Sequence, residues 1–438
     1  MRVQSFADRR IAADPGAVRI TLGEILFFTG LVLWTVQMYV MRSYYEPFFG
    51  SLFTKGVRWL CVFIFAAKIM LTEETVSIKA MAVAGLAGML MIVSQHAGGM
   101  GMTLLQLYMM LLAARGISFK RICKVSMWAC LFCFIAVVLG DQLGPLHVMP
   151  LNEWDRFREY LGFQYVSFGA IYFHNIMFCA FYAYTDRPWD VRGRQRPASL
   201  SWPAIALILA GHLWLYVMTD TSLAMAVGVL GVLLYVVVVK FGLDLFADHP
   251  VIRAGALLIF PVLAVFTYYV CDHYKMGTPL WTRINDFSHN RVELTYQGLR
   301  KYGVHLFGRV VEANTDFQKG KYFYIDSGYM KNLLSLGVIF MILLLALYAM
   351  MSYSAVRTRD RVLCIWMLCV ALYSIFNNYM ISPVENTSIL AIWYAASALG
   401  ERRAYDREKE IRRRRKRSRI CSGADAVGPA SVRGLRRT

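Results

Sequence analysis

At 438 residues, with 58% hydrophobic side chains, a mean hydropathy of +0.46 and 17% charged residues, the chain is too apolar for a water-soluble domain of ordinary composition. Much of its formal net charge of +19 comes from the residues after Glu401, so the basic balance belongs to one tail and not to a nucleic-acid-binding face. The composition therefore indicates a helical protein that crosses a membrane several times.

Apolar runs divide the chain into expected membrane spans. Because the bilayer core is about 30 Å thick, a helix that crosses it needs roughly 20 apolar residues. About twelve runs approach this length, so the sequence predicts an all-α polytopic integral membrane protein with about twelve transmembrane helices. The expected spans are 21–40, 57–72, 79–96, 101–114, 125–140, 162–184, 201–218, 222–240, 251–271, 332–352, 362–380 and 385–399.

The distribution of positive charges predicts on which side of the membrane each connection between spans lies. Arg2, Arg9 and Arg10 precede the first span, which has no small-residue cleavage site, so we expect an uncleaved anchor with a cytoplasmic N-terminus. The even-numbered connections are rich in Arg and Lys, and an even number of spans returns the C-terminus to the cytoplasm. We expect residues 1–400 to form the membrane domain and 401–438 a basic, disordered cytoplasmic tail that contacts anionic lipid.

The sequence lacks the residue patterns that metal sites, disulfide frameworks and nucleotide binding require. The nine cysteines lie mostly in apolar runs, and the pair Cys130 and Cys133 has no second ligand pair, so core packing explains them better than a metal site or a disulfide framework. There is no Gly-Lys-Ser/Thr phosphate loop, and His, Asp and Glu residues nowhere have metal-ligand spacing. We therefore expect no metal, no other cofactor and no ATP-driven transport.

A long polar insert between the ninth and tenth spans is the expected place for chemistry. Residues 272–335 are too charged and too rich in Gly and Asn to cross a membrane, so we expect a large outward loop. Apolar residues recur at three- and four-residue steps from Val292 to Leu306, which predicts an amphipathic helix on the membrane surface. Arg291 would lie in its first turn, where a guanidinium and backbone N–H groups can receive phosphate oxygens. The alternative is an interfacial arginine that reaches lipid headgroups.

Asp326 lies at the outer mouth of the expected tenth span. A partly desolvated carboxylate there can act as a base or anchor sugar hydroxyls, because desolvation raises its pKa. The order Asp-Ser-Gly is also typical of a helix N-cap, so a purely structural role stays open.

A smaller outward loop, 141–161, carries Arg158 and leads into a span that contains His174 and Asn175. Polar groups at membrane depth are costly, so they usually face the bundle interior or a wet cavity. For His174 a satisfied buried histidine is the simpler interpretation, and a substrate contact is the alternative.

Three segments carry a resemblance to a known family. Ser288-His-Asn-Arg291 stands in the late loop, followed in 301–308 by Lys-Tyr-Gly and Leu-Phe-Gly. Residues 325–337 contain Asp-x-x-Tyr-x-x-x-Leu-x-x-x-Gly at the entry to a span, and 158–163 contain Arg and Leu-Gly-Phe ahead of Asn175. These patterns, and the plan of the whole chain, resemble the Wzy-type O-antigen and capsular polysaccharide polymerases, relatives of the O-antigen ligases. His and Asn replace the family's small residue before the Arg.

The resemblance implies a membrane glycosyltransferase that polymerises a capsular, exopolysaccharide or O-antigen chain at the bacterial plasma membrane. Its substrate would be an undecaprenyl-diphosphate-linked oligosaccharide, joined at the outer face without metal or nucleotide. An O-antigen-ligase-like glycan transferase and a flippase for lipid-linked oligosaccharide are the alternatives. The implied partners are membrane lipids, a flippase and a chain-length regulator, and no nucleic acid. Thr221-Ser-Leu223 departs from a family Ser-Arg, so one cation would come from elsewhere.

Under this resemblance, Arg291 and Asp326 are the expected catalytic residues. Arg291 would hold the diphosphate, with a second arginine beside it, and Asp326 would orient or deprotonate the attacking sugar hydroxyl. Aromatic, imidazole and amide side chains would supply further contacts. The expected substrate-binding residues are Arg158, Arg283, Arg300, Tyr329, His289, His174 and Asn175.

Overall fold

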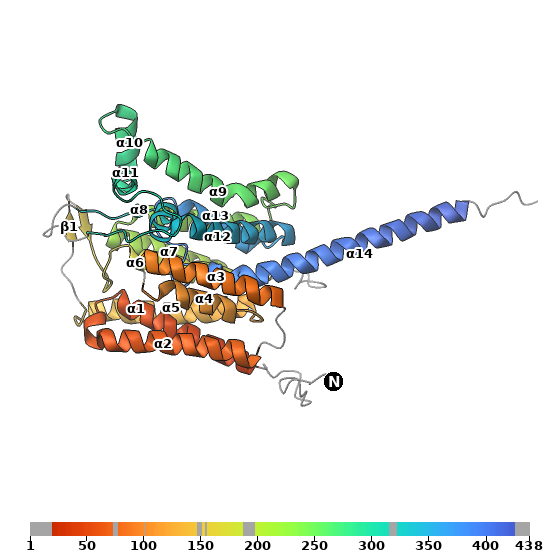
Figure 1. The fold of residues 1–438 in the computed structure, drawn as a ribbon, viewed down its shortest axis with the longest axis horizontal. Coiled ribbons are helices and arrows are strands. Elements are labelled where there is room, and N and C mark those ends of the chain that lie inside the picture. Colours follow the sequence, from red (N-terminus) through yellow and green to blue (C-terminus); the bar gives the residue numbers. More distant parts are fainter. Residues whose placement is uncertain are drawn as a thin grey trace, which may run out of the picture.

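The computed structural model describes residues 20–72, 78–99, 101–146, 151–153, 156–186, 198–314 and 322–424. These residues form a bundle of helices, with one pair of short antiparallel strands, β1 (Leu151–Glu153) and β2 (Arg156–Arg158) (Figure 1). The helices are α1 (Leu22–Met41), α2 (Glu46–Thr72), α3 (Ile78–Ala97), α4 (Thr103–Ala113), α5 (Phe119–Gln142), α6 (Phe168–Ala183), α7 (Trp202–Thr219), α8 (Ser222–Tyr235), the π-helical turn η2 (Val236–Lys240), α9 (Pro250–Asp272), α10 (Pro279–Phe287), α11 (Arg291–Tyr302), α12 (Gly328–Thr358), α13 (Arg361–Tyr373), the 3₁₀ turn η4 (Thr387–Ala391) and α14 (Ile392–Ala424).

Within this part of the chain, seven helices are long and apolar enough to cross a membrane. They are α1, α2, α5, α7, α8 with η2, α9 and α12. Shorter apolar helices include α4, α6, α13 and most of α3. The chain is therefore a helical membrane protein, as its composition predicted.

The last two expected spans are interrupted. The expected span 362–380 is helical only as far as Tyr373, and 385–399 begins with a 3₁₀ turn before α14. In the segment between α13 and η4, Pro383 has no backbone N–H to donate. Asn386 in the same segment donates from its side-chain amide to Tyr348 Oη at 2.8 Å. Polar side chains, and not a continuous helix, hold this backbone in the bundle.

The bundle has an apolar outside and a tightly packed inside. Helix α6 is only 16 residues long but is buried along nearly its whole length, because α5, α7, α8 and α13 pack around it. By contrast, α9 presents Val262, Val265 and Phe266 outward, and α5 presents Phe132. Large apolar side chains spread over the outer surface suit contact with lipid.

The two ends of the bundle differ. One end, which we call the loop end, carries β1, β2, α10 and α11 (Figure 1). At the other, the tail end, α14 leaves the bundle as a long helix. This helix continues to Ala424, whereas the sequence analysis expected residues 401–438 to be disordered. Residues 425–438 of that expected tail lie outside the described residues.

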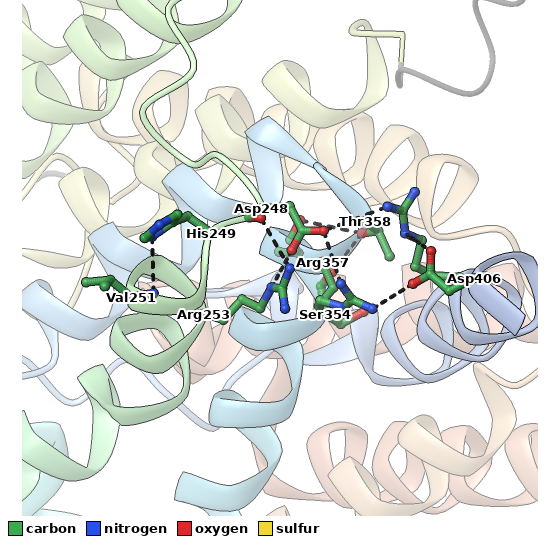
Figure 2. A network of polar contacts seen from close by, with 10 residues as sticks. Asp248, His249, Val251, Arg253, Ser354, Arg357, Thr358 and Asp406 are labelled. Carbon is green, nitrogen blue, oxygen red and sulfur yellow. Dashed lines mark hydrogen bonds and ion pairs between the residues drawn. The ribbon is translucent and has the colours of Figure 1, made fainter. Parts of the chain in front are cut away.

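An ion-pair network fixes the start of this extension at the tail end (Figure 2). Asp248 pairs with Arg253 and accepts from Arg357 Nη1 at 3.1 Å. Arg357 Nη2 also donates to Asp406 at 2.7 Å, and Arg402 lies 3.8 Å from Asp248 and 3.5 Å from Asp406. The Asp248 side chain is 6% exposed. The connection before α9, helix α12 and helix α14 therefore meet at one buried carboxylate.

Two glycines let the loop end dock on α12. Gly337 breaks the helix with φ 87°, and the freed N–H groups of Val338 and Ile339 donate to His305 O at 3.0 Å and Leu306 O at 3.1 Å. A Cβ on Gly308 would lie 2.2 Å from Ser335 O, so only glycine permits this approach. The segment after α11 is thus bonded directly into the kink of α12.

Replacing Asp248 by Asn should destabilise the protein. The change leaves Arg253 without its carboxylate and Arg357 and Arg402 with Asp406 alone. Removing one partner of a buried pair in this way costs about 3–5 kcal/mol. We expect a lower thermal unfolding midpoint in detergent and faster tryptic cleavage near the start of the α14 extension. Glu401→Gln, at an exposed position of the same helix, is the control, and equal midpoints for the two variants would contradict the role given to Asp248.

Candidate substrate site at the loop end

Helix α11 begins at Arg291, as the sequence predicted. The turn before it is left-handed at two positions, His289 with φ 52° and Asn290 with φ 63°. Asn285 holds this turn, because its side-chain amide donates to Asn290 Oδ1 at 3.0 Å and its Oδ1 accepts from Glu293 N at 3.0 Å. Such backbone is unfavourable for residues other than glycine, so these hydrogen bonds are needed to fix the direction in which Arg291 leaves the helix.

The apolar residues predicted on α11 are largely buried, but against other helices of the protein and not on a membrane surface. Val292, Leu299 and Tyr302 are buried, and α11 contacts α9 and α12. Leu306, which the pattern included, lies beyond the end of the helix and is 63% exposed. The reason is Gly303, whose positive φ ends the helix at Tyr302.

Arg291 and Asp326 form an ion pair across 35 positions of sequence. Arg291 Nε donates to Asp326 Oδ2 at 3.1 Å, and the two side chains are 25% and 14% exposed. Burial raises the pKa of the Asp326 carboxyl, and the charge and hydrogen bond of Arg291 oppose that rise. Helix α12 is capped by Ser327, whose hydroxyl accepts from Met330 N at 3.4 Å. The N-cap interpretation thus falls on Ser327, and the Asp326 carboxylate contacts Arg291.

Three charged residues that the sequence analysis did not select lie beside this pair. Arg42 follows the last residue of α1, Lys331 lies in the first turn of α12, and Glu385 lies between α13 and η4. Lys331 Nζ donates to Tyr324 Oη at 2.6 Å and lies 4.0 Å from the centre of its ring. Glu385 is 5% exposed and is coupled electrostatically to Arg42 and Lys331. Charged side chains from elements distant in sequence therefore lie near the Arg291–Asp326 pair.

Arg158 belongs to the same group of charges. Its Nε donates to Thr219 O at 3.0 Å, at the end of α7. Burial raises the pKa of Tyr165 to about 12, with Asp326 adding to the rise and Arg291 and Arg158 opposing it. These couplings join Arg158 electrostatically to the Arg291–Asp326 pair.

The other expected substrate-binding residues at the loop end have different surroundings. Arg300 pairs with Asp272 at 3.3 Å at the end of α9. Arg283 is exposed on α10, and His289 is exposed on the turn next to Arg291. Tyr329 is fully buried, and its hydroxyl donates to Ala371 O at 2.9 Å, so this side chain packs against α13 and does not face the charged group.

Asn175 holds the segment that carries Glu385. Its side-chain Nδ2 donates to Thr387 Oγ1 at 3.0 Å, and its Oδ1 accepts from Thr387 N at 2.8 Å. His174 is buried beside it in α6, with ring centroids 4.9 Å from His212 and 5.2 Å from Tyr373. The structure therefore gives Asn175 a positioning contact. His174 makes packing contacts only, and since neither ring nitrogen has a hydrogen-bond partner among the described residues, the expected satisfied histidine is not found.

The signals for the missed residues were weak but present. Arg42 and Lys331 each lie at the end of a span, where cations are ordinary and indicate topology. Glu385 opens an expected span, and an acidic residue in an apolar run is uncommon enough to mark a functional position. Nothing in the local pattern shows that these three side chains meet.

The assembled charges favour an anionic ligand. Four cations face two carboxyl groups, so positive charge remains in excess even when both carboxyls are ionised. Guanidinium and ammonium groups in such a setting suit phosphate oxygens. Among the residues described, no group of three or more His, Cys, Asp or Glu side chains could hold a metal ion. The residues, which we call the loop-end cluster, are Arg42, Arg158, Arg291, Lys331, Asp326 and Glu385.

Comparison with known proteins adds no relative. No protein-family model matches this chain, and neither a curated protein nor a solved structure matches it. Function therefore has to be inferred from the chemistry of the loop-end cluster.

Asn175→Ala should loosen the segment around Glu385. The variant leaves the backbone N–H of Thr387 without its acceptor inside the bundle, which costs about 2–3 kcal/mol. We expect a lower thermal unfolding midpoint than for Gln142→Ala, which removes an exposed amide. An Asn175→Ala protein as stable as the Gln142→Ala control would show that this contact does not hold the segment.

Proposed function

We propose that this protein is a polysaccharide polymerase that joins undecaprenyl-diphosphate-linked oligosaccharide repeat units at the outer face of a bacterial plasma membrane. The observation that carries the proposal is the loop-end cluster, where half-buried cations in excess lie near a largely desolvated carboxylate. A diphosphate needs the cations, and an attacking sugar hydroxyl needs the carboxylate. The resemblance to Wzy-type polymerases selects this reaction from others that join a hydroxyl to a phosphate-activated group.

The proposed topology has about twelve crossings, with both termini in the cytoplasm and the loop end outside. Its support is the distribution of basic residues. Lys120, Arg121, Arg357 and the described basic part of α14 gather at the tail end, as the positive-inside rule expects for a cytoplasmic face. The loop end would then meet lipid-linked sugars presented outside.

In the proposed reaction, the acceptor hydroxyl oxygen attacks the anomeric carbon of the donor sugar. The bond from that carbon to the diphosphate breaks, and its electron pair stays on the diphosphate oxygen. Arg291 and Arg158 stabilise this charge, and Asp326 receives the hydroxyl proton, which burial helps because it makes the carboxylate more basic. No nucleotide enters the step, since the diphosphate is the leaving group.

Arg158 also provides a cation near Thr221-Ser-Leu223, where the chain departs from the Ser-Arg of the family pattern. It donates to Thr219 O, two residues before Thr221, so a cation lies close to the position where the family often carries a Ser-Arg. This placement supports Arg158 as the second cation. Arg300 and Arg283 are less well placed for that role, because one pairs with Asp272 and the other is exposed.

Two alternatives predict different outcomes. A flippase for the same lipid needs cations along a path through the bundle. Here the ion pairs Arg291–Asp326 and Arg357–Asp248 lie at the two ends of the bundle, which favours a transferase. A ligase-like transferase would use the same cluster but a different acceptor, so the product identifies it.

Arg291→Ala and Asp326→Asn should abolish polymer formation by a protein that still folds. Removing a group that stabilises transition-state charge costs on the order of a hundredfold or more in rate. The assay incubates purified protein with lipid-diphosphate-linked repeat units and follows a ladder of longer lipid-linked glycans on a gel. Lys275→Gln, an exposed cation at the same end, is the control. A full ladder from folded Arg291→Ala would contradict the assignment.

Truncation within α14 separates an enzyme from a scaffold recruited by its basic tail. Ending the chain after Asp406 keeps the ion pairs of Arg402 and Asp406 with Arg357 and Asp248 but removes the basic run that follows. We expect ladder formation in vitro within about twofold of the full chain, because the cluster lies at the other end. Loss of activity in a truncated protein of unchanged thermal stability would favour the scaffold.

A further inference from the structure

A cavity of about 240 Å³ lies toward the tail end of the bundle, between α9, α12 and α13. Its lining is apolar and includes Ile252 and Ile259 of α9 and Met367 of α13. Ile259 follows Ile252 by seven positions, which is about 10 Å of helix. Gly255, which also lines the cavity, is exposed on α9. Because α9 and α12 are both long and apolar enough to cross a membrane, the open side of the cavity faces hydrocarbon.

One hydroxyl side chain, Ser352 of α12, lines this apolar cavity. Ser352 is 4% exposed, and its Oγ has no hydrogen-bond partner among the described residues. Neighbouring hydroxyls of the same helix do have partners. Ser354 Oγ donates to Ala395 O at 2.6 Å, and Thr358 Oγ1 donates to Ser354 O at 2.8 Å. A buried hydroxyl without a partner is costly, so Ser352 is suited to donate to an oxygen of a ligand in the cavity.

Cations lie at the tail end of α12, next to this cavity. Val356 lines the cavity, Arg357 follows it, and Arg359 is the C-cap of the helix. Arg357 is neutralised by Asp248 and Asp406 (Figure 2). Arg359 is exposed and makes no ion pair within the part of the chain that the structure describes. Its guanidinium is therefore available to an anion at the membrane surface.

The apolar lining, the hydroxyl and the cation follow the order of the parts of a glycerophospholipid. Ser352 precedes Arg357 by five positions, which places it about 7.5 Å farther from the tail end along α12. In a glycerophospholipid the ester carbonyls likewise lie between the phosphate and the acyl chains. A free anion would have no use for the apolar lining, and a plain hydrocarbon would have none for Ser352 or Arg359.

We propose that this cavity is a binding site for one glycerophospholipid with an anionic headgroup. Part of one acyl chain fills the cavity, an ester carbonyl oxygen accepts from Ser352 Oγ, and the phosphate lies at Arg359. No covalent bond changes. The site lies at the opposite end of the bundle from the loop-end cluster, so the inference stands independently of the proposed polymerase.

Native mass spectrometry of the full chain tests the cavity. The protein is released from detergent micelles that contain phosphatidylglycerol, and the lipid that it retains is measured. Wild type should retain one lipid, whereas Gly255→Trp should lose it, because a Cβ at Gly255 meets no atom within 4 Å and the indole has room to occupy the cavity. Gly85→Trp, at an exposed position of α3 with equally open space, is the control. Equal retention by the two tryptophan variants would overturn the site.

Two further variants test the polar contacts while the cavity stays open. Ser352→Ala should weaken retention of phosphatidylglycerol about fivefold, since one hydrogen bond is lost. Wild type should prefer phosphatidylglycerol about tenfold over phosphatidylethanolamine with the same acyl chains, and Arg359→Gln should remove this preference. Arg403→Gln, an exposed cation of α14, should keep it. Unchanged retention in Ser352→Ala and Arg359→Gln would overturn the site even if Gly255→Trp failed to fold.

Two competitions identify other occupants of the cavity. Phosphatidylglycerol that excess dodecyl maltoside displaces as readily from wild type as from Gly255→Trp would show an adventitious additive only. Undecaprenyl phosphate that displaces phosphatidylglycerol at a much lower concentration would assign the cavity to an isoprenoid chain and overturn the phospholipid. The measurement uses no saccharide, so its result does not depend on whether the protein forms a glycan ladder.

Discussion

The low polarity of the membrane interior decides where charge can lie in this protein, and the two ends of the bundle meet that constraint differently. At the tail end, each of Arg253, Arg357 and Arg402 has a carboxylate within ion-pair distance, supplied by Asp248 or Asp406. At the loop end, Arg291 has a partner in Asp326, but Arg42 and Lys331 have no carboxylate in contact among the described residues. These two cations therefore differ from the three arginines of the tail-end network, each of which has a carboxylate partner.

Irregular backbone inside a helical bundle faces the same constraint. A chain that leaves helical geometry at membrane depth must find hydrogen-bond partners in the protein. The segment after α13 does so through Asn175, which bonds Thr387 on two sides, and through Tyr348, which accepts from Asn386. The result is a rigid support for Glu385. The kink at Gly337 serves a similar purpose on α12, where the freed N–H groups bond to the loop after α11.

The local sequence pattern predicts the separate elements of the candidate site better than it predicts which charged side chains the fold brings together. The apolar period predicts α11 and the place of Arg291, and the position of Asp326 before α12 predicts a partly desolvated carboxylate there. Glu385 and Arg42 were missed because their significance comes from contacts across more than 300 positions, which periodicity does not record. The spans 362–380 and 385–399 are expected to be continuous helices because hydropathy carries no information on hydrogen bonds such as those between Asn175 and Thr387. Tyr329 was expected at a sugar site, but a single sequence does not tell which face of α12 turns inward.

The central claim is that the loop-end cluster receives the diphosphate of a lipid-linked substrate. The most direct measurement is a cryo-electron microscopy structure of the protein, enlarged with a bound antibody fragment, in nanodiscs that contain an undecaprenyl-diphosphate-linked oligosaccharide. We expect density for the diphosphate between Arg291, Arg42 and Lys331, with the isoprenoid along the outside of the bundle. Density for the diphosphate at the tail end or along a path through the bundle, with the loop-end cluster empty, would contradict it.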